Sequence, residues 1–285
     1  SYLTHDSIHK DILKKEDIQI LDYTNIMINN NIIKLLDSRE PNKNMWSDYN
    51  VSYLFDSTGV FLDKEGAKKH NVDYFIMCAP SKDDTKQFLY NGNHNDYNGE
   101  KIVSNSSCTT NSIVPLLKIL DEEYEINSAN FLTVHAATAS QRPIDGVHLK
   151  SRIHRSVFNN IIPHTTGASK SAIKILPSLE GKLYGSSVRI PTSNVSMVDL
   201  NVSLKKKEKL SDILYFLKQQ PEIQVSEDKH LVSSDFMTTT NPTIVDSNAC
   251  MDMSNGEYKF TIWYDNEWSY SAQAIKLLNH MYKNS

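Results

Sequence analysis

The feature that most constrains the fold is an alternation of short apolar strands with helical segments, beginning near residue 51. Residues 52–59 indicate a strand that runs into a Ser/Thr/Gly turn, and residues 73–81 indicate a second strand with a similar ending. Between them, residues 63–70 are typical of a short helix. Strands joined by a helix normally lie parallel, and the loops at their carboxyl ends carry function. The pattern predicts a parallel α/β sheet with functional loops at the strand ends.

A further strand–loop–helix unit surrounds Cys108. Residues 101–104 indicate a strand, and the apolar spacing of residues 113–120 predicts a buried helix. Cys108 therefore falls at or near a helix start. His135 falls at the end of another expected strand, residues 129–135, and small residues follow it.

The rest of the chain shows mixed patterns. Residues 195–204 alternate between apolar and polar side chains, which predicts a half-buried antiparallel strand. Residues 259–264 indicate a strand followed by a loop, and residues 270–282 a helix with Ile275, Leu278 and Met281 inward. The first fifty residues lack glycine and are typical of short strands joined by polar turns.

Composition excludes several classes of protein. The 285 residues carry a net charge of −4 and 22% charged residues, and no apolar run approaches the about eighteen residues of a membrane span. The slight acidity argues against nucleic acid as the main partner. A soluble globular protein is expected.

The three cysteines, Cys78, Cys108 and Cys250, are widely spaced and form no C-x-x-C pair. This spacing argues against a disulfide framework and against a zinc site, so no metal is expected. A reducing, cytoplasmic compartment fits best. The amino end lacks the basic start and apolar run of a signal peptide and also lacks an initiator Met, which suggests a trimmed or partial chain.

Cys108 and His135 are the candidates for covalent chemistry. A helix amino end and a nearby imidazolium both favour a thiolate, and an imidazole can serve as its base. A buried cysteine and a hydrogen-bonded core histidine remain the alternative interpretation of these two residues taken alone.

Four longer motifs carry a resemblance. Residues 104–111 (SNSSCTTN), 133–141 (TVHAATASQ), 189–200 (RIPTSNVSMVDL) and 263–271 (WYDNEWSYS) occur in this order. They resemble the active-site octapeptide, the catalytic-histidine strand, the R-V-P-T-x-N-V-S strand and the W-Y-D-N-E loop of phosphorylating glyceraldehyde-3-phosphate dehydrogenases. The resemblance is collinear from about Asp6 to Met281, which is nearly the whole chain.

The resemblance implies an oxidoreductase of glycolysis. It implies that the Cys108 thiolate attacks the aldehyde of glyceraldehyde 3-phosphate and that His135 is the base. It also implies release of the resulting thioester by inorganic phosphate as 1,3-bisphosphoglycerate, and an oxyanion held partly by the Cys108 N–H. Two phosphate sites are implied: Thr138 and Arg189 for the substrate, and Ser107, Thr109, Thr166 and Gly167 for inorganic phosphate. Turn formation and helix capping are the alternative roles of the Ser and Thr residues.

The resemblance also implies a nicotinamide cofactor, NAD, with NADP left open. The residues expected at the cofactor are Ser57, Thr58, Gly59, Ser81, Asn266 and Tyr270. His148, Arg152 and Arg155 lie in what resembles the family's S-loop, where subunit contacts of a homotetramer and the cofactor wall are expected.

The sequence departs from the family in two ways. None of the nine glycines forms a G-x-G, so the usual phosphate-binding turn of a dinucleotide fold is not found. Residues 4–10 (THDSIHK) resemble a family turn that follows this unit. Weak NAD binding and exposed apolar sheet edges and faces are therefore expected. Ser269 replaces a glycine, which predicts strain if that position needs a positive φ.

The architecture expected is α/β, with an incomplete Rossmann-type doubly wound cofactor domain and an α+β catalytic domain whose sheet is largely antiparallel. The cofactor domain is expected at residues 1–107 with 266–285, and the catalytic domain at 108–265. Two alternatives stay open. One is a catalytically impaired homologue that serves as a structural or binding subunit, and the other is an erythrose-phosphate dehydrogenase on the same scaffold.

Overall fold

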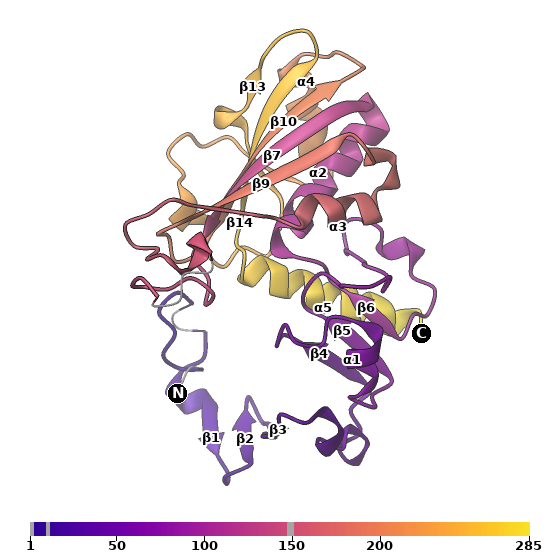
Figure 1. Ribbon diagram of the computed structural model, residues 1–285, viewed down its shortest axis with the longest axis vertical. Coiled ribbons are helices and arrows are strands. Elements are labelled where there is room, and N and C mark those ends of the chain that lie inside the picture. Colours follow the sequence, from indigo (N-terminus) through magenta and orange to yellow (C-terminus); the bar gives the residue numbers. More distant parts are fainter. Residues whose placement is uncertain (1–2, 10–11, 147–150) are drawn as a thin grey trace.

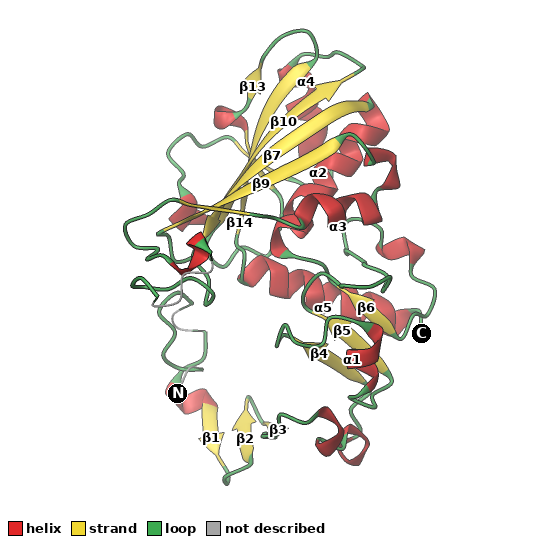
Figure 2. Ribbon diagram, in the orientation of Figure 1, coloured by secondary structure: helices red, strands yellow, loops and turns green. Residues whose placement is uncertain are grey.

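The computed structural model describes residues 3–9, 12–146 and 151–285, and Figures 1 and 2 show their arrangement. Within these ranges the chain forms a mixed α/β structure with three separate sheets. The mixed architecture expected from the sequence is confirmed.

A parallel sheet of order β4-β5-β6 corresponds to the predicted α/β alternation. Its strands are β4 (Tyr53–Asp56), β5 (Tyr74–Met77) and β6 (Ile102–Ser104), and α1 (Lys64–Lys68) lies between the first two in sequence. The Asp63 side chain caps α1 by accepting a hydrogen bond from the Gly66 N–H at 2.7 Å. Apolar side chains pack on both faces of this sheet, around Ala67 of α1 on one and Leu277 of α5 (Trp268–Lys283) on the other.

A larger, mostly antiparallel sheet holds the main core. Its strands, in spatial order, are β11 (Gln224–Ser226), β12 (Ile244–Asp246), β14 (Glu257–Tyr264), β10 (Ser196–Leu204), β7 (Ile126–Ala136), β9 (Leu183–Ile190) and β8 (Ile162–His164), with β13 (Met251–Asp252) paired to β14. The helices α2 (Cys108–Tyr124), α3 (Ala168–Ile175) and α4 (Leu210–Lys218) cover one face (Figure 2). The alternation predicted for residues 195–204 is confirmed, because every second residue of β10 is buried.

The antiparallel strands β1 (Ile18–Ile20), β2 (Asn25–Ile28) and β3 (Asn31–Lys34) form a third sheet, set apart from the other two at the bottom of Figure 1. Ile20 is 78% exposed and Ile32 is 68% exposed. The strands predicted in this segment are confirmed.

Short 3-10 helices complete the described elements. They are η1 (Lys15–Asp17), η2 (Pro41–Lys43), η3 (Trp46–Tyr49), η4 (His94–Asp96), η5 (Arg152–His154), η6 (Pro177–Leu179), η7 (Ser233–Phe236) and η8 (Ser247–Ala249).

The inward face predicted for the last helix is partly wrong. Ile275 is 51% exposed, whereas Ala274, Leu277 and Met281 are buried. Successive residues of an α-helix are about 100° apart, so positions 274, 277 and 281 share one stripe and Ile275 lies outside it.

Gly185 gives a stability prediction. It lies opposite Phe131 in the parallel β7–β9 pair, and a Cβ at Gly185 would lie 2.3 Å from the Phe131 Cζ atom. Because Phe131 is buried, its ring can move only by disturbing the core. Gly185→Ala should lower the free energy of unfolding by about 1–3 kcal/mol, measured by urea denaturation. Ser186→Ala on the same strand is the matched control, and a Gly185→Ala protein of unchanged stability would contradict the prediction.

Candidate active site

Cys108 is the first residue of α2. The preceding Ser107 has an extended backbone, and its hydroxyl accepts a hydrogen bond from the Thr110 N–H at 3.1 Å. This is a helix N-cap, which fixes where the helix begins. Ser106 has a φ of 55°, and the Tyr270 hydroxyl donates to its carbonyl at 3.1 Å. The turn before Cys108 is thus held in a left-handed conformation that few residues adopt.

His135 faces Cys108 from the carboxyl end of β7. Its Nε2 lies 3.4 Å from the Cys108 Sγ atom. The parallel register of β7 with β9 places Arg189 directly beside His135. Arg189 Nη1 donates to the Ala136 carbonyl at 3.0 Å and lies 2.5 Å from His135 Nδ1. A thiol, an imidazole and a guanidinium therefore meet at one point, as the sequence predicts for the first two.

Burial and the Arg189 charge set the protonation of this cluster. Burial raises the pKa of the Cys108 thiol, while the Arg189 cation opposes that rise. Burial, with the Arg189 cation second, lowers the pKa of His135 to about 4. His135 is therefore neutral at physiological pH and available as a proton acceptor.

Tyr264 contacts the elements that carry Cys108 and His135, and the sequence analysis did not predict it. Its hydroxyl is hydrogen-bonded to the Thr109 and Thr133 hydroxyls, each at 2.9 Å. Burial raises the pKa of Tyr264, so its hydroxyl stays protonated. The Tyr264 ring also meets the His135 ring edge-to-face, with centroids 6.1 Å apart. These contacts join the start of α2 to β7 and β14.

A cavity of about 180 Å³ lies at the thiol. Five predicted phosphate-site residues line it: Ser107, Thr109, Thr166, Gly167 and Arg189. Thr138, predicted with Arg189 for the substrate phosphate, is not among the lining residues. Its N–H and hydroxyl both donate to Gln141 Oε1, at 2.8 Å and 3.0 Å, and these bonds close a turn after β7. Its role at the substrate stays a prediction.

The same cavity contains residues that the sequence analysis missed: Thr133, His164, Thr165 and Ser187. His164 ends β8 and pairs with Ser187 of β9. Thr166 and Gly167, which follow it closely, were predicted for the phosphate site, but a single histidine beside them gave no signal of its own.

The cavity carries positive charge without a protein counter-ion. Within the described part of the chain, no carboxylate forms an ion pair with Arg189, and its buried Nε–H has no hydrogen-bond partner. No Asp or Glu lines the cavity within those residues. A half-buried guanidinium among hydroxyls and the start of α2 is suited to an anion.

A second cavity of about 650 Å³ lies beside α5. Of the predicted cofactor residues, Ser57, Asn266 and Tyr270 line it, together with Cys78 and Ile275. The exposed position of Ile275, which departed from expectation, thus forms part of this wall.

The other predicted cofactor residues lie outside this second cavity. The Thr58 hydroxyl donates to Asp56 Oδ1 at 2.6 Å, and the Ser81 hydroxyl donates to the Thr85 carbonyl at 3.0 Å. Gly59 occupies a turn with φ of 70°. Each of these residues stabilises the loop after its strand, and their contact with a cofactor stays a prediction.

The side-chain amide of Asn266 is oriented by Ser196. The Ser196 oxygen accepts a hydrogen bond from the Ala136 N–H at 3.0 Å, and its hydroxyl donates to Asn266 Oδ1 at 2.8 Å. Ser196 thus holds the carbonyl oxygen of the amide, and the NH₂ group is the part of it that can donate. Ser196 was missed by the sequence analysis, although it lies within a recognised motif.

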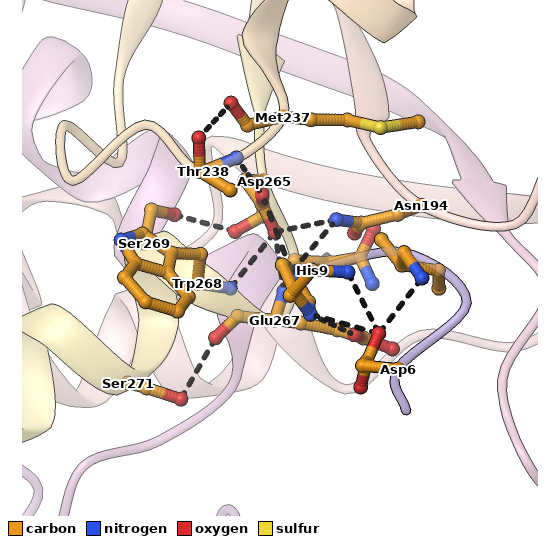
Figure 3. A network of polar contacts seen from close by, with 12 residues as sticks. Asp6, His9, Asn194, Met237, Thr238, Asp265, Glu267, Trp268, Ser269 and Ser271 are labelled. Carbon is orange, nitrogen blue, oxygen red and sulfur yellow. Dashed lines mark hydrogen bonds and ion pairs between the residues drawn. The ribbon is translucent and has the colours of Figure 1, made fainter. Parts of the chain in front are cut away.

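Asp265 anchors this region, as Figure 3 shows. Its carboxylate is fully buried. Oδ1 accepts hydrogen bonds from the Asn194 amide at 3.0 Å and the Trp268 N–H at 2.8 Å, and Oδ2 accepts one from the Thr238 N–H at 2.8 Å. His9 lies 3.9 Å from Oδ2, which joins the amino-terminal segment to the network.

The strain expected at Ser269 is not present. Ser269 lies within α5 rather than in a loop with positive φ, and its hydroxyl donates to the Asp265 carbonyl at 2.6 Å. The left-handed residue here is Val195, with φ of 65°. Its two neighbours, Asn194 and Ser196, make the bonds to Asp265 and Asn266, so the strained backbone positions both.

The predicted S-loop is described only in part. Arg152 lies in η5, and Arg155 Nε donates to Asp145 Oδ2 at 2.8 Å on the surface. His148 lies outside the described residues.

Comparison with known proteins agrees with this geometry. Residues 107–266 match the model of the glyceraldehyde 3-phosphate dehydrogenase C-terminal domain. A glyceraldehyde-3-phosphate dehydrogenase of Bacteroides fragilis (strain YCH46) is 40% identical over 262 residues, which cover 88% of this chain and 78% of the relative. The chain belongs to the glyceraldehyde-3-phosphate dehydrogenase family.

Other members of the family come from different compartments. A cytosolic glyceraldehyde-3-phosphate dehydrogenase of Leishmania mexicana is 39% identical over 264 residues, covering 90% of this chain and 80% of the relative. A chloroplastic one of Arabidopsis thaliana is 38% identical over 289 residues, covering 98% and 68%. None of the helices in the described ranges has the length and apolar character needed to cross a membrane.

The Arg189 charge gives a prediction for His135. Replacing Arg189 with Leu removes one of the two main causes of the low His135 pKa and leaves burial in place. The pKa should rise from about 4 toward the ordinary histidine value of about 6.5 without reaching it. NMR titration of histidine-labelled protein measures the change. Arg155→Leu, at an exposed arginine, should leave the His135 pKa unchanged, and an equal effect of both variants would contradict the assignment.

Proposed function

We propose that this chain oxidises glyceraldehyde 3-phosphate to 1,3-bisphosphoglycerate with NAD and inorganic phosphate, through a thioester at Cys108. The observation that supports this most directly is the 3.4 Å contact between Cys108 Sγ and His135 Nε2 at the start of α2. Nucleophile and base are within reach of each other, and an anion-binding cavity adjoins them. Membership of the family supports the same reaction.

The protein residues account for the proton steps. His135 Nε2 takes the Cys108 proton as sulfur bonds to the aldehyde carbon, which gives a hemithioacetal. The oxyanion that develops lies near the free N–H groups at the start of α2. His135 returns its proton to this oxyanion, which completes the hemithioacetal hydroxyl. His135 then accepts that hydroxyl proton while hydride leaves the same carbon, and the product is a thioester. An oxygen of inorganic phosphate attacks the thioester carbon and the C–S bond breaks. The acyl phosphate is released, and Cys108 is left as a thiolate.

A nicotinamide supplies the hydride acceptor when it is bound. The nicotinamide end of the cofactor would be held by Ser57, Asn266 and Tyr270, because the Asn266 NH₂ group can donate and the second cavity is large. For the pyrophosphate the sequence offers no G-x-G turn. NAD is proposed as the cofactor, and NADP is the alternative to be assayed beside it. Thr58, Gly59 and Ser81 are proposed to contribute outside the second cavity.

Two phosphates are proposed to bind at the catalytic cavity. Arg189, with Thr138, would hold the substrate phosphate, and Ser107, Thr109, Thr166 and Gly167 the attacking inorganic phosphate. The uncompensated Arg189 charge supports this arrangement. When a substrate phosphate engages Arg189, its positive charge is neutralised beside His135, and the imidazole becomes a stronger base.

Residues 1–107 with 266–285 are proposed as the cofactor domain and 108–265 as the catalytic domain. A cytoplasmic homotetramer is the proposed assembly. The Thr165-Thr166-Gly167 segment favours a triose over an erythrose phosphate by its resemblance to triose enzymes.

Thiol labelling and turnover test the chemistry. In the whole gene product, iodoacetamide should label Cys108 before Cys78 and Cys250. Burial raises the pKa of all three thiols, but His135 Nε2 lies 3.4 Å from the Cys108 sulfur and can take its proton. Cys108→Ser should abolish NADH formation from glyceraldehyde 3-phosphate, and His135→Asn should slow it by about 100-fold or more. An inactive gene product whose three thiols react equally slowly would favour the impaired, structural homologue instead.

Ser196 gives a prediction about the cofactor. Ser196→Ala frees the Asn266 amide to rotate, so the KM for NAD should rise by about three- to tenfold with a smaller effect on kcat. Ser196→Thr keeps the hydroxyl and should retain most of the affinity. Ser203→Ala, elsewhere on β10, is the control. Equal NAD affinity in the Ser196→Ala protein would show that Asn266 is held by other means.

A further inference from the structure

His164 is positioned toward the catalytic cavity by strand pairing. It is the last residue of β8 and lies opposite Ser187 of β9, two residues before Arg189 on that strand. Both His164 and Ser187 line the 180 Å³ cavity that contains Cys108 and His135. The electrostatic influence of His164 reaches His135 and contributes to lowering its pKa. The His164 imidazole therefore lies in the same cavity as the thiol and the base.

The hydrogen bonding of His164 leaves one nitrogen for a ligand. Nδ1 lies 2.5 Å from the Thr165 carbonyl oxygen. A carbonyl can only accept, so Nδ1 carries a proton in both the neutral and the charged imidazole. Nε2 has no hydrogen-bond partner within the described residues. Nε2 is consequently an acceptor when His164 is neutral and a donor when it is protonated.

The surroundings favour an anion at this nitrogen. Arg189 lies nearby with an unpartnered, buried Nε–H, and the lining residues given by the structure include no carboxylate. We propose that His164 is a protonation-dependent contact for the inorganic phosphate of this cavity, donating Nε2–H to a phosphate oxygen at low pH. The inference rests on the phosphate site of the proposed function.

The neighbouring groups can be separated from His164 by their own titrations. Burial raises the pKa of Cys108, and the pKa of His135 is about 4, so neither group changes charge between about pH 5.5 and 8. Arg189 remains a cation throughout. β8 also packs against η5, which contains Arg152 and His154. His154 is thus the second imidazole that must be controlled.

Sulfate is the suitable probe, because it remains a dianion over this range whereas phosphate itself titrates. Equilibrium dialysis of the whole gene product with radiolabelled sulfate should show about five- to tenfold tighter binding at about pH 5.5 than at about pH 8. His164→Asn keeps a donor near the Nδ1 position but cannot reach the anion. It should remove this pH dependence and bind at the weak, high-pH level.

His164→Gln places a neutral amide donor near the Nε2 position. Its sulfate affinity should be intermediate and nearly independent of pH, a result that a merely structural histidine would not give. His154→Asn is the matched control and should retain the wild-type pH profile. Loss of the profile in His154→Asn, or its persistence in His164→Asn, would overturn the proposal.

A parallel measurement separates this inference from the proposed function. If sulfate and phosphate fail to bind the wild-type protein, the His164 proposal is overturned, and Cys108 labelling and NADH formation on the same sample then show whether the catalytic assignment fails with it. If both anions bind and the enzyme turns over, but the His164 variants match the wild type at every pH, only the His164 proposal fails.

Discussion

The structure of the site depends on the contact between the Cys108 thiol and the His135 imidazole. The two residues belong to different elements, the start of α2 and the end of β7, and neither element could place them alone. Their approach is fixed by the packing of α2 on the large sheet, where Leu116, Leu117 and Leu120 are fully buried. Each such side chain contributes about 1.5–3 kcal/mol through burial, so the distance between the thiol and the imidazole is set by the main core and not by loops.

The sequence predicted the parts of the site that local pattern controls. A strand, a polar loop and an apolar helix in succession placed Cys108 at a helix start, and a strand end placed His135. Alternation likewise gave β10. Ile275 was misplaced because the inward stripe of α5 follows Ala274, Leu277 and Met281, and the apolar residues next to that stripe made its phase ambiguous.

Contacts between distant segments could not be predicted in this way. Tyr264 reaches Thr109 across 155 positions and Ser196 reaches Asn266 across 70, and only the paired strands reveal them. His164 had no recognisable signal because its significance comes from its partner strand β9. Thr58 and Ser81 lie in the expected loops, but their hydroxyls bind nearby groups of the same chain segment, a competition that residue type alone does not resolve.

Helix α5 links the large sheet to the small parallel sheet. Its first turn is held by the Asp265 carboxylate at the end of β14, while Leu277 and Met281 pack against the parallel sheet near its opposite end. The helix is therefore a rigid connection between the parallel sheet and the region of Asn266. A rotation of the parallel sheet relative to the large sheet would be transmitted through α5 and would tilt the Asn266 amide relative to the Cys108 thiol. Core residues more than two helical turns away from Asn266 thereby influence how this amide lies relative to the Cys108 thiol.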